Sequence, residues 1–148
     1  MSISQDIVKE VEQWLGVPYQ HRGITNRGCD CSGLLIGVLQ SLGYMKDYQL
    51  RKYPKDWNLH AMADNYLEEE LLKIANEIKE APQPGDVLLF FFGRCKAHLG
   101  IVTKHPLFVH CYKDSKKVVY GVMNKVSPWY SNLAGVYRID ENKLRNVK

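Results

Sequence analysis

The sequence contains no uninterrupted apolar run of about eighteen residues, the length that a transmembrane helix needs, so we expect no membrane span. Residues 1–12 carry several charged side chains among their apolar residues. They therefore lack the basic start and continuous apolar stretch of a secretory signal. We expect cytoplasmic synthesis and retention there unless another device exports the chain. Internal repeats, low-complexity segments and linker-like stretches are also absent, which favours one domain over residues 1–148.

Cysteine is scarce and the charge is nearly balanced. The four cysteines suit a reduced compartment, where thiols serve chemistry or packing rather than cross-linking. Apolar residues make up 45% of the chain and charged residues 24%, which excludes a mainly disordered protein. A formal net charge of +4 attracts acidic polymers only weakly, so we expect no nucleic-acid partner.

Three stretches carry apolar residues at helical spacing. The first covers residues 3–15 and begins with a capping-box pattern. The second covers residues 34–42 and ends at Gly43, a typical C-terminal helix residue. The third covers roughly residues 59–79 and is broken by the segment Pro-Gln-Pro-Gly that follows.

The second half of the chain changes character. Short β-type runs follow one another, separated by hairpin-like turns: residues 86–92, 99–103, 107–112, 117–122 and 135–139. Helices followed by a meandering sheet indicate the α+β class. We expect N-terminal helices packed on an antiparallel sheet of about five strands, with a helical insert around residues 44–80.

Cys31 lies in the segment GCDCSG, where a glycine-containing loop becomes an apolar helix. A cysteine at a helix N-terminus faces unpaired backbone N–H groups and the positive end of the helix dipole, and both favour the thiolate. Such a cysteine can be nucleophilic, and the same N–H groups can stabilise an oxyanion. We therefore predict that Cys31 is a nucleophile; the alternative is a buried structural thiol.

A thiolate nucleophile also needs a base that later protonates the leaving amine. His98 opens the run HLGIV, and His110 lies in the run LFVHCY, which we expect to be the neighbouring strand. Adjacent antiparallel strands would bring the two imidazoles side by side. His98 could then accept the thiol proton while His110 orients its ring.

Zinc binding is an alternative use of the same residues. Cys29, Cys31, Cys95 and His98 are ligands of the kind that zinc takes. The Cys-x-Cys spacing is tighter than usual, and zinc would leave His110 without a role. We therefore expect neither a metal nor an organic cofactor.

Five segments resemble the successive motifs of the NlpC-type cysteine peptidases, a family of bacterial cell-wall endopeptidases with a minimal papain-like fold. These segments are WLGVPYQHRG, GCDCSGLLIGVLQSLGY, QPGDVLLFF, AHLGIV and LFVHCY. The resemblance spans roughly residues 14–112, and Asp-Cys-Ser-Gly is its most specific part. It implies Cys31 as nucleophile, His98 as base and His110 as the orienting third residue.

The resemblance also implies a substrate-binding set. Tyr19 matches a family tyrosine that lines the site, and Asp30 and Ser32 match positions that help to recognise the substrate peptide, often through its free amino end. Asp30 could instead cap the helix, and Tyr19 could be ordinary packing. We expect His21, in the loop before the nucleophile, to have a surface role.

Three features are similar to the phage-tail and gene-transfer-particle branch of the family. The chain reads Gln-His-Arg-Gly after Tyr19, where many members have Trp-Gly-Gly, the nucleophile segment reads CDCSGL, and YPKDW occupies residues 53–57. The similarity implies phage-tail proteins as partners and incorporation into a phage-like particle, which would carry the protein to the wall.

The expected function is hydrolysis of an amide bond in bacterial peptidoglycan, in a stem peptide or crosslink, through a Cys-His-His triad and an acyl-enzyme. One alternative is a cysteine amidase acting on another small acyl substrate. The other is a catalytically silent structural component of a tail.

Overall fold

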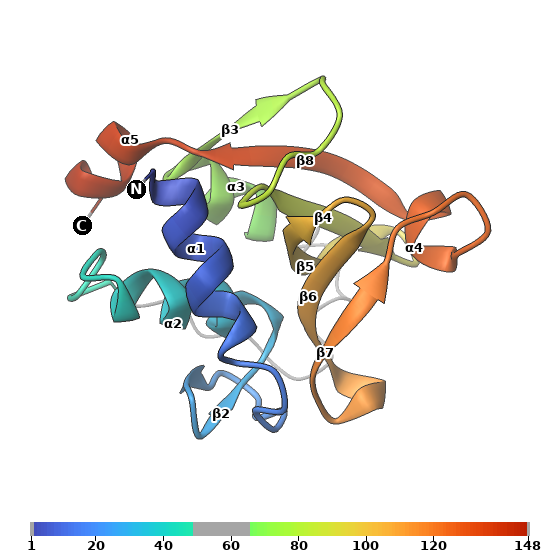
Figure 1. Ribbon diagram of the computed structural model, residues 1–148, viewed down its shortest axis with the longest axis horizontal. Coiled ribbons are helices and arrows are strands. Elements are labelled where there is room, and N and C mark those ends of the chain that lie inside the picture. The colour runs from blue at the N-terminus through green and yellow to red at the C-terminus, as the bar shows by residue number, and fades with distance from the viewer. Residues whose placement is uncertain (1, 49–65, 148) are drawn as a thin grey trace.

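The computed structural model describes residues 2–48 and 66–147 (Figure 1). Its helices are α1 (Ile3–Glu12), α2 (Cys31–Ser41), α3 (Tyr66–Leu72), α4 (Pro128–Ser131) and α5 (Glu141–Asn146), with a short 3-10 turn, η3, at Lys113–Ser115. Within these described ranges, no helix is long and apolar enough to cross a membrane.

Six antiparallel strands form the main sheet, in the order β3-β8-β4-β5-β6-β7. Their bounds are β3 Ala75–Ile78, β4 Val87–Phe92, β5 Cys95–Lys104, β6 Leu107–Tyr112, β7 Lys117–Val122 and β8 Leu133–Ile139. Two short strands, β1 (Ile24–Thr25) and β2 (Gly28–Cys29), form a separate hairpin before α2. The predicted α+β arrangement is therefore confirmed, with six strands in place of about five.

The third predicted helix is correct only in part. Residues 59–65 lie outside the described residues, and so do residues 49–58 of the expected insert, which include YPKDW. Helix α3 is present, but Ala75–Ile78 is strand β3, paired with β8. Because α3 and β3 follow each other directly, their apolar residues together imitate one helical stripe. The ladder to β8 supplies long-range hydrogen bonds that the local pattern does not reveal.

Helix α2 has the ends that its sequence suggests. Asp30 is the N-cap, and its side chain accepts a hydrogen bond from the Gly33 N–H. At the other end Gly43 has a φ of 93°, the left-handed region that favours glycine. The N–H of Tyr44 reaches the carbonyl of Leu39, which completes a Schellman motif. Residues 32–39 are all buried, so α2 is a core helix rather than an amphipathic one.

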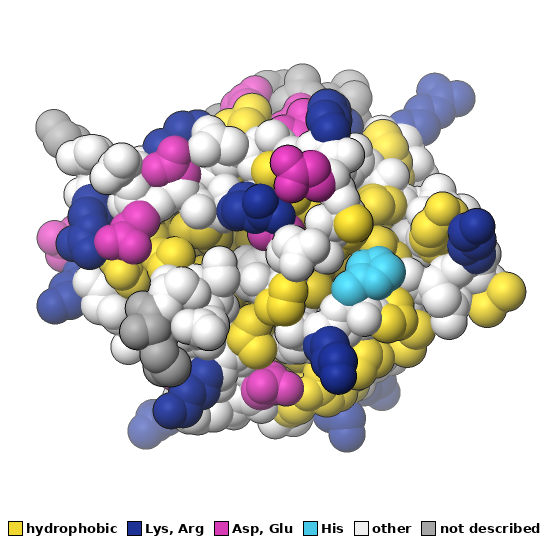
Figure 2. Space-filling view, turned by 45° about the horizontal axis from the view of Figure 1, so that its top comes forward, with side chains coloured by type: hydrophobic (Ala, Val, Ile, Leu, Met, Phe, Trp, Pro, Cys, Tyr) yellow, Lys and Arg dark blue, Asp and Glu magenta, His cyan; other side chains and the backbone are white. Residues whose placement is uncertain are grey.

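The sheet has a core on each face. Helices α1, α2 and α3 cover one face with the larger cluster, which includes Leu99, Ile101 and Val109. Helix α4 lies away from α1 and α2 in Figure 1, and its Trp129 packs on the smaller cluster, which includes Phe90 and Phe108. On the face drawn in Figure 2, basic and acidic side chains are interspersed, with hydrophobic side chains visible between them.

Strand β7 lies at one edge of the sheet, and the segment after α1 runs along it. The N–H of Gly16 donates to the carbonyl of Val118 at 2.9 Å, and the N–H of Tyr19 donates to the carbonyl of Lys116 at 2.8 Å. These bonds fix the loop that leads from α1 to α2. They also bring Tyr19 to the start of α2, where a parallel bridge joins it to Cys29.

Gly37 sets the separation of α1 and α2. A Cβ at this position would overlap the indole of Trp14 and the carbonyl oxygen of Ile24. We predict that Gly37→Ala lowers the free energy of unfolding by about 2 kcal/mol, because overpacking outweighs the better helix propensity of alanine. Ser41→Ala, at an exposed position of the same helix, is the matched control. Urea unfolding measures both, and an unchanged midpoint for Gly37→Ala would contradict the packing.

Candidate active site

Cys31 is the first residue of α2 and is partly exposed, whereas its neighbours Asp30 and Ser32 are buried. The placement at a helix start is the one predicted. Helix dipoles and free N–H groups act most strongly within this first turn. The thiol therefore lies where a negative charge on sulfur, or on an attached oxyanion, would meet favourable backbone groups.

Asp30 holds the loop before α2 as well as the helix itself. Its Oδ1 accepts hydrogen bonds from the Gly33 N–H at 2.8 Å and from the Ser32 hydroxyl at 3.3 Å. Its Oδ2 accepts from the Arg22 N–H at 2.9 Å. The structure thus places Asp30 as the helix cap, the alternative that its sequence position had left open. A direct contact with substrate would compete with these bonds.

Gly33 is needed for the same loop to approach the helix. A Cβ there would overlap the carbonyl oxygen of Gly23, and the N–H of Asp30 donates to that same oxygen at 3.3 Å. Gly33, two residues after Cys31, therefore accommodates another stretch of this chain. Because Gly33 has no side chain, residues 20–23 can pack directly against the start of α2.

The Cys31 thiol lies against the backbone of β5. Its S–H donates to the carbonyl oxygen of Ala97 at 3.8 Å, and the N–H of Leu99 also acts on the sulfur. In the described sheet the paired positions of β5 and β6 begin at Ile101, so the polar groups of Ala97 and Leu99 are not part of that ladder. The Cys31 thiol lies at this stretch of β5, in contact with backbone groups of the residues before and after His98.

Burial raises the pKa of the Cys31 thiol, and the negative charge of Asp30 raises it further. The N–H groups of Leu99 and Ser32 act in the opposite direction, with a smaller effect. The resting thiol is therefore protonated at neutral pH. This differs from the ionised thiol expected from the sequence, because desolvation and a neighbouring carboxylate outweigh the helix terminus.

The two histidines form a buried pair. Nε2 of His98 lies 2.7 Å from Nδ1 of His110, and each residue is 2% exposed. The side-by-side placement predicted from adjacent strands is present. Because this contact uses Nε2 of His98, Nδ1 is the nitrogen left for a thiol proton.

Both imidazoles are neutral at pH 7. Burial lowers the pKa of His98 well below its usual value, and His110 lowers it further. Burial alone lowers the pKa of His110 to about 4. A neutral imidazole has one N–H and one lone pair, so one ring donates to the other in the pair.

The thiol and the imidazoles belong to different faces of the sheet. Leu99 and Cys111 pack in the core beneath α2, and strand alternation turns His98 and His110 toward the other face. There the imidazole of His98 packs against Phe90 and Phe92. Among the described residues no hydrogen bond joins Cys31 to either ring. The thiol therefore contacts the backbone of the strand that carries His98, and the two imidazoles contact each other. The structure shows no hydrogen bond between the thiol and the His98 ring among the described residues.

Tyr19 and His21 lie in the loop beside Cys31. Burial raises the pKa of Tyr19 to about 12, and the charges of Asp30 and Cys31 raise it as well, which places its ring near the thiol. Tyr19 and His21 are both partly exposed. Tyr19 thus lies near the thiol.

The four ligands of the zinc alternative are not assembled. Within the described ranges, no three side chains of His, Cys, Asp or Glu are grouped to hold a metal. Cys29 is fully buried and faces Cys111, whose thiol donates to the Cys29 carbonyl at 3.0 Å. All four cysteines are free thiols.

Sequence reasoning missed the aromatic residues around the histidine pair. Trp129 has ring contacts with both imidazoles, at centroid distances of 5.3 and 4.8 Å, and Tyr112 stacks on His110 at 5.6 Å. Ser127 caps α4 and Pro128 is its first residue, so the Ser-Pro start of a short helix was the available signal. Nothing local indicates that this helix covers the histidines.

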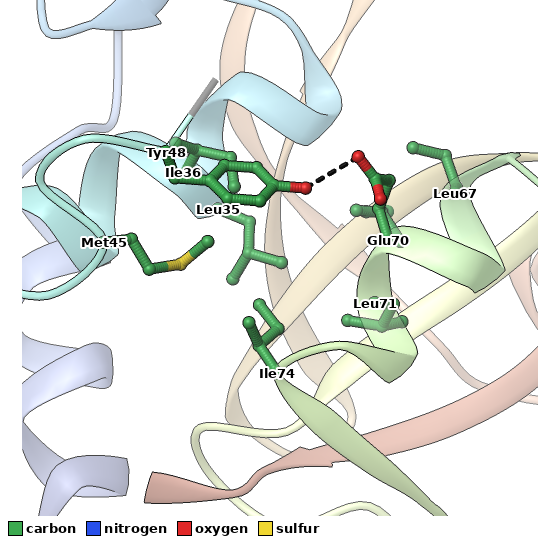
Figure 3. Close-up of a pocket in the computed structure, with 9 residues that line it drawn as sticks. Leu35, Ile36, Met45, Tyr48, Leu67, Glu70, Leu71 and Ile74 are labelled. Carbon is green, nitrogen blue, oxygen red and sulfur yellow. Dashed lines mark hydrogen bonds between the residues drawn. The ribbon is translucent and has the colours of Figure 1, made fainter. Parts of the chain in front are cut away.

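A small cavity lies on the α2 side of the sheet, between α2 and α3 (Figure 3). Its volume is about 20 Å³, and its lining is apolar except for Tyr48 and Glu70. The Tyr48 hydroxyl donates to Glu70 at 2.7 Å, and Lys73 forms an ion pair with the same carboxylate. Because such a volume holds about one water molecule, the cavity is a packing feature rather than a peptide site.

An antiparallel sheet covered by N-terminal helices, a cysteine opening a helix and paired histidines on adjoining strands define a papain-like cysteine hydrolase. The chain matches the model of the NlpC/P60 family over residues 16–138 and therefore belongs to that family. In fold it is similar to the structure of NlpC1 from Trichomonas vaginalis, with a TM-score of 0.66 at 19% identity. That likeness covers 92% of this chain and 44% of the other.

Two curated relatives come from Escherichia coli K12. The probable endopeptidase NlpC is 27% identical over 132 residues, covering 88% of this chain and 74% of the relative. The murein DD-endopeptidase MepS/murein LD-carboxypeptidase is 26% identical over 125 residues, covering 84% of this chain and 57% of the relative. The chain thus spans little more than half of the second relative.

The lowered histidine pKa values predict that acid destabilises the protein. Below the ordinary pKa of 6.5 the unfolded chain binds protons that buried His110 excludes down to about 4. His110 alone should therefore remove about 3 kcal/mol of unfolding free energy by about pH 4. Urea unfolding across this range should show a shallower pH dependence for His110→Asn than for the parent. His105→Asn, at an exposed histidine, should keep the parental dependence. Equal slopes for His110→Asn and the parent would contradict the buried neutral pair.

Proposed function

We propose that the protein is a cysteine endopeptidase that hydrolyses an amide bond in the peptide part of bacterial peptidoglycan, with Cys31 as nucleophile. The observation that carries the proposal is the position of the thiol, at the start of α2 and against the β5 backbone on either side of His98. The names of the two relatives, an endopeptidase and a murein hydrolase, support the substrate class.

The reaction begins with proton transfer from a neutral thiol to a neutral imidazole. His98 can accept on Nδ1 only if its Nε2–H donates to Nδ1 of His110, because the opposite tautomer would place the proton on Nδ1 of His98. His110 thus selects the tautomer in which His98 is a base. It also stabilises the imidazolium that forms, by accepting its Nε2–H.

Closing the thiol–imidazole contact is part of substrate binding. Hydrogen bonds of catalytic groups are often long in the free enzyme and tighten in the Michaelis complex. Here the thiol gives up its bond to the Ala97 carbonyl and moves along the β5 backbone toward Nδ1 of His98, whose bond to His110 is kept. Because the described sheet pairs β5 with β6 only from Ile101 onward, the movement breaks no ladder hydrogen bond of β6.

Attack of the thiolate on the amide carbonyl gives a tetrahedral oxyanion at the start of α2. The N–H of Gly33 already serves Asp30, whereas the N–H of Ser32 acts on the Cys31 sulfur. We assign the Cys31 and Ser32 N–H groups as oxyanion donors. The imidazolium of His98 then protonates the leaving amine, and water deprotonated by His98 hydrolyses the thioester.

Tyr19, Asp30 and Ser32 are proposed to take part in recognising the substrate peptide, Tyr19 by contact and Asp30 through its charge. Tyr19 is the most accessible of the three and lies beside the thiol. The buried Asp30 carboxylate places a negative charge beside Tyr19 and Cys31. This charge would attract the free amino end of a substrate peptide. A stem peptide with a free amine is therefore favoured over a neutral small acyl substrate.

Cys31→Ala is expected to fold as the parent and to lower hydrolysis by about three orders of magnitude or more, because the covalent step is lost. Mass spectrometry of muropeptides after incubation with murein measures the loss and identifies the bond that is cut. Cys95→Ala, at a buried thiol outside the site, should retain activity. Undiminished product with Cys31→Ala would refute the nucleophile.

The phage-like particle implied by the segments CDCSGL and YPKDW is also a proposal. Such a particle would carry the protein to the wall. We expect the protein to co-sediment with tail-like particles from induced host cells and to be detected in them by peptide mass spectrometry. Purified particles that lack the chain, while the cell extract retains it, would contradict this association.

A further inference from the structure

Trp129 lies at the centre of the aromatic cluster that encloses the histidine pair. Its ring stacks on His98 at 5.3 Å with an interplanar angle of 29°, and meets His110 edge-on at 4.8 Å. It also contacts Phe90 at 5.2 Å and Tyr112 at 5.1 Å. No other ring in the cluster packs as closely on both imidazoles.

The exposure of these residues shows what Trp129 does for the pair. Both histidines are 2% exposed, whereas Trp129 is partly exposed. The indole therefore separates the imidazoles from solvent on the face away from α2. Removing it would open that face of the pair to water, and hydrated imidazoles regain an ordinary pKa.

The backbone around Trp129 holds the indole in place. Helix α4 begins with a cap, in which the Tyr130 N–H donates to the Ser127 hydroxyl. The carbonyl of Asn132, just after α4, accepts a hydrogen bond from the Phe91 N–H at 2.8 Å. This bond fixes α4 to β4, the strand that also carries Phe90 and Phe92. Trp129 is thus fixed relative to the sheet.

We propose that Trp129 is a positioning residue for the reaction. It keeps the His98–His110 hydrogen bond dry and its rings in one orientation, so that both imidazoles stay neutral and Nδ1 of His98 remains the basic nitrogen. Trp129 acts through the histidines and does not touch substrate. What the pair does chemically rests on the proposed function, but the effect of Trp129 on the pair does not.

The test compares Trp129→Ala and Trp129→Phe with Tyr130→Ala, which removes an aromatic ring of the same helix that is 46% exposed. NMR of the imidazole nitrogens follows the tautomer and the pKa of each ring. With Trp129→Ala the pKa of His110 should rise by about one unit or more from its low value. With Trp129→Phe the pKa should stay close to the low parental value, because a ring still covers the pair. Tyr130→Ala should titrate like the parent.

Murein turnover gives the second readout. In Trp129→Ala we expect kcat to fall by a few-fold at most near pH 6, as the pKa moves back toward its ordinary value, and by less near pH 8, with KM within about twofold. If Trp129→Ala does not fold, Trp129→Gln admits water while filling part of the space and carries the same measurements.

Titrations and pH profiles unchanged from the parent in the folded variant would overturn the role of Trp129. If the parent protein itself does not hydrolyse murein, that result would instead count against the proposed function. The NMR shifts would still decide the role of Trp129.

Discussion

The hydrogen bond between His98 and His110 is the constraint on which the site depends. It is 2.7 Å long and lies between two residues that are almost completely buried. A buried polar pair of this kind is stable only if each ring satisfies the other, and only if both are neutral. Pairing of β5 with β6 brings the two rings together. The aromatic cover from α4 excludes water from them, and so keeps them neutral. The same condition fixes which nitrogen of His98 can act as a base.

Cys31 is held by a second set of interactions, centred on Asp30. One carboxylate caps α2, anchors the Arg22 backbone and holds the hydroxyl of Ser32. Its charge also raises the pKa of the adjacent thiol. The resting enzyme therefore has a protonated thiol and neutral imidazoles, rather than an ion pair. In the proposed mechanism, substrate binding brings the thiol and His98 together and so generates the nucleophile.

Much of the fold follows from short-range patterns in the sequence. The capping box of α1, the glycine that ends α2 and the alternating runs of β4 to β8 are local signals, and each is present in the structure. Strand β3 could not be found in this way, because its apolar residues continue the stripe of α3 and its partner β8 is distant in the sequence.

For the site, too, the features that depend on local sequence were predicted and those that depend on tertiary contacts were not. The helix start at Cys31 and the neighbouring strands of His98 and His110 follow from local pattern, and their adjacency is present in the structure. The thiol pKa was not predictable, because a helix terminus contributes about 0.3–1 kcal/mol whereas desolvation of a charge costs several kcal/mol. The cover by Trp129 depends on tertiary contacts alone.

The central claim is that the Cys31 sulfur forms a covalent bond with the acyl part of the substrate. The direct measurement is acid quenching of the enzyme during turnover of murein peptides, followed by peptide mapping. The account predicts a thioester on the peptide that contains Cys31, together with a released amine, and no such adduct on Cys29, Cys95 or Cys111. Turnover without any adduct, or an adduct confined to another cysteine, would contradict it.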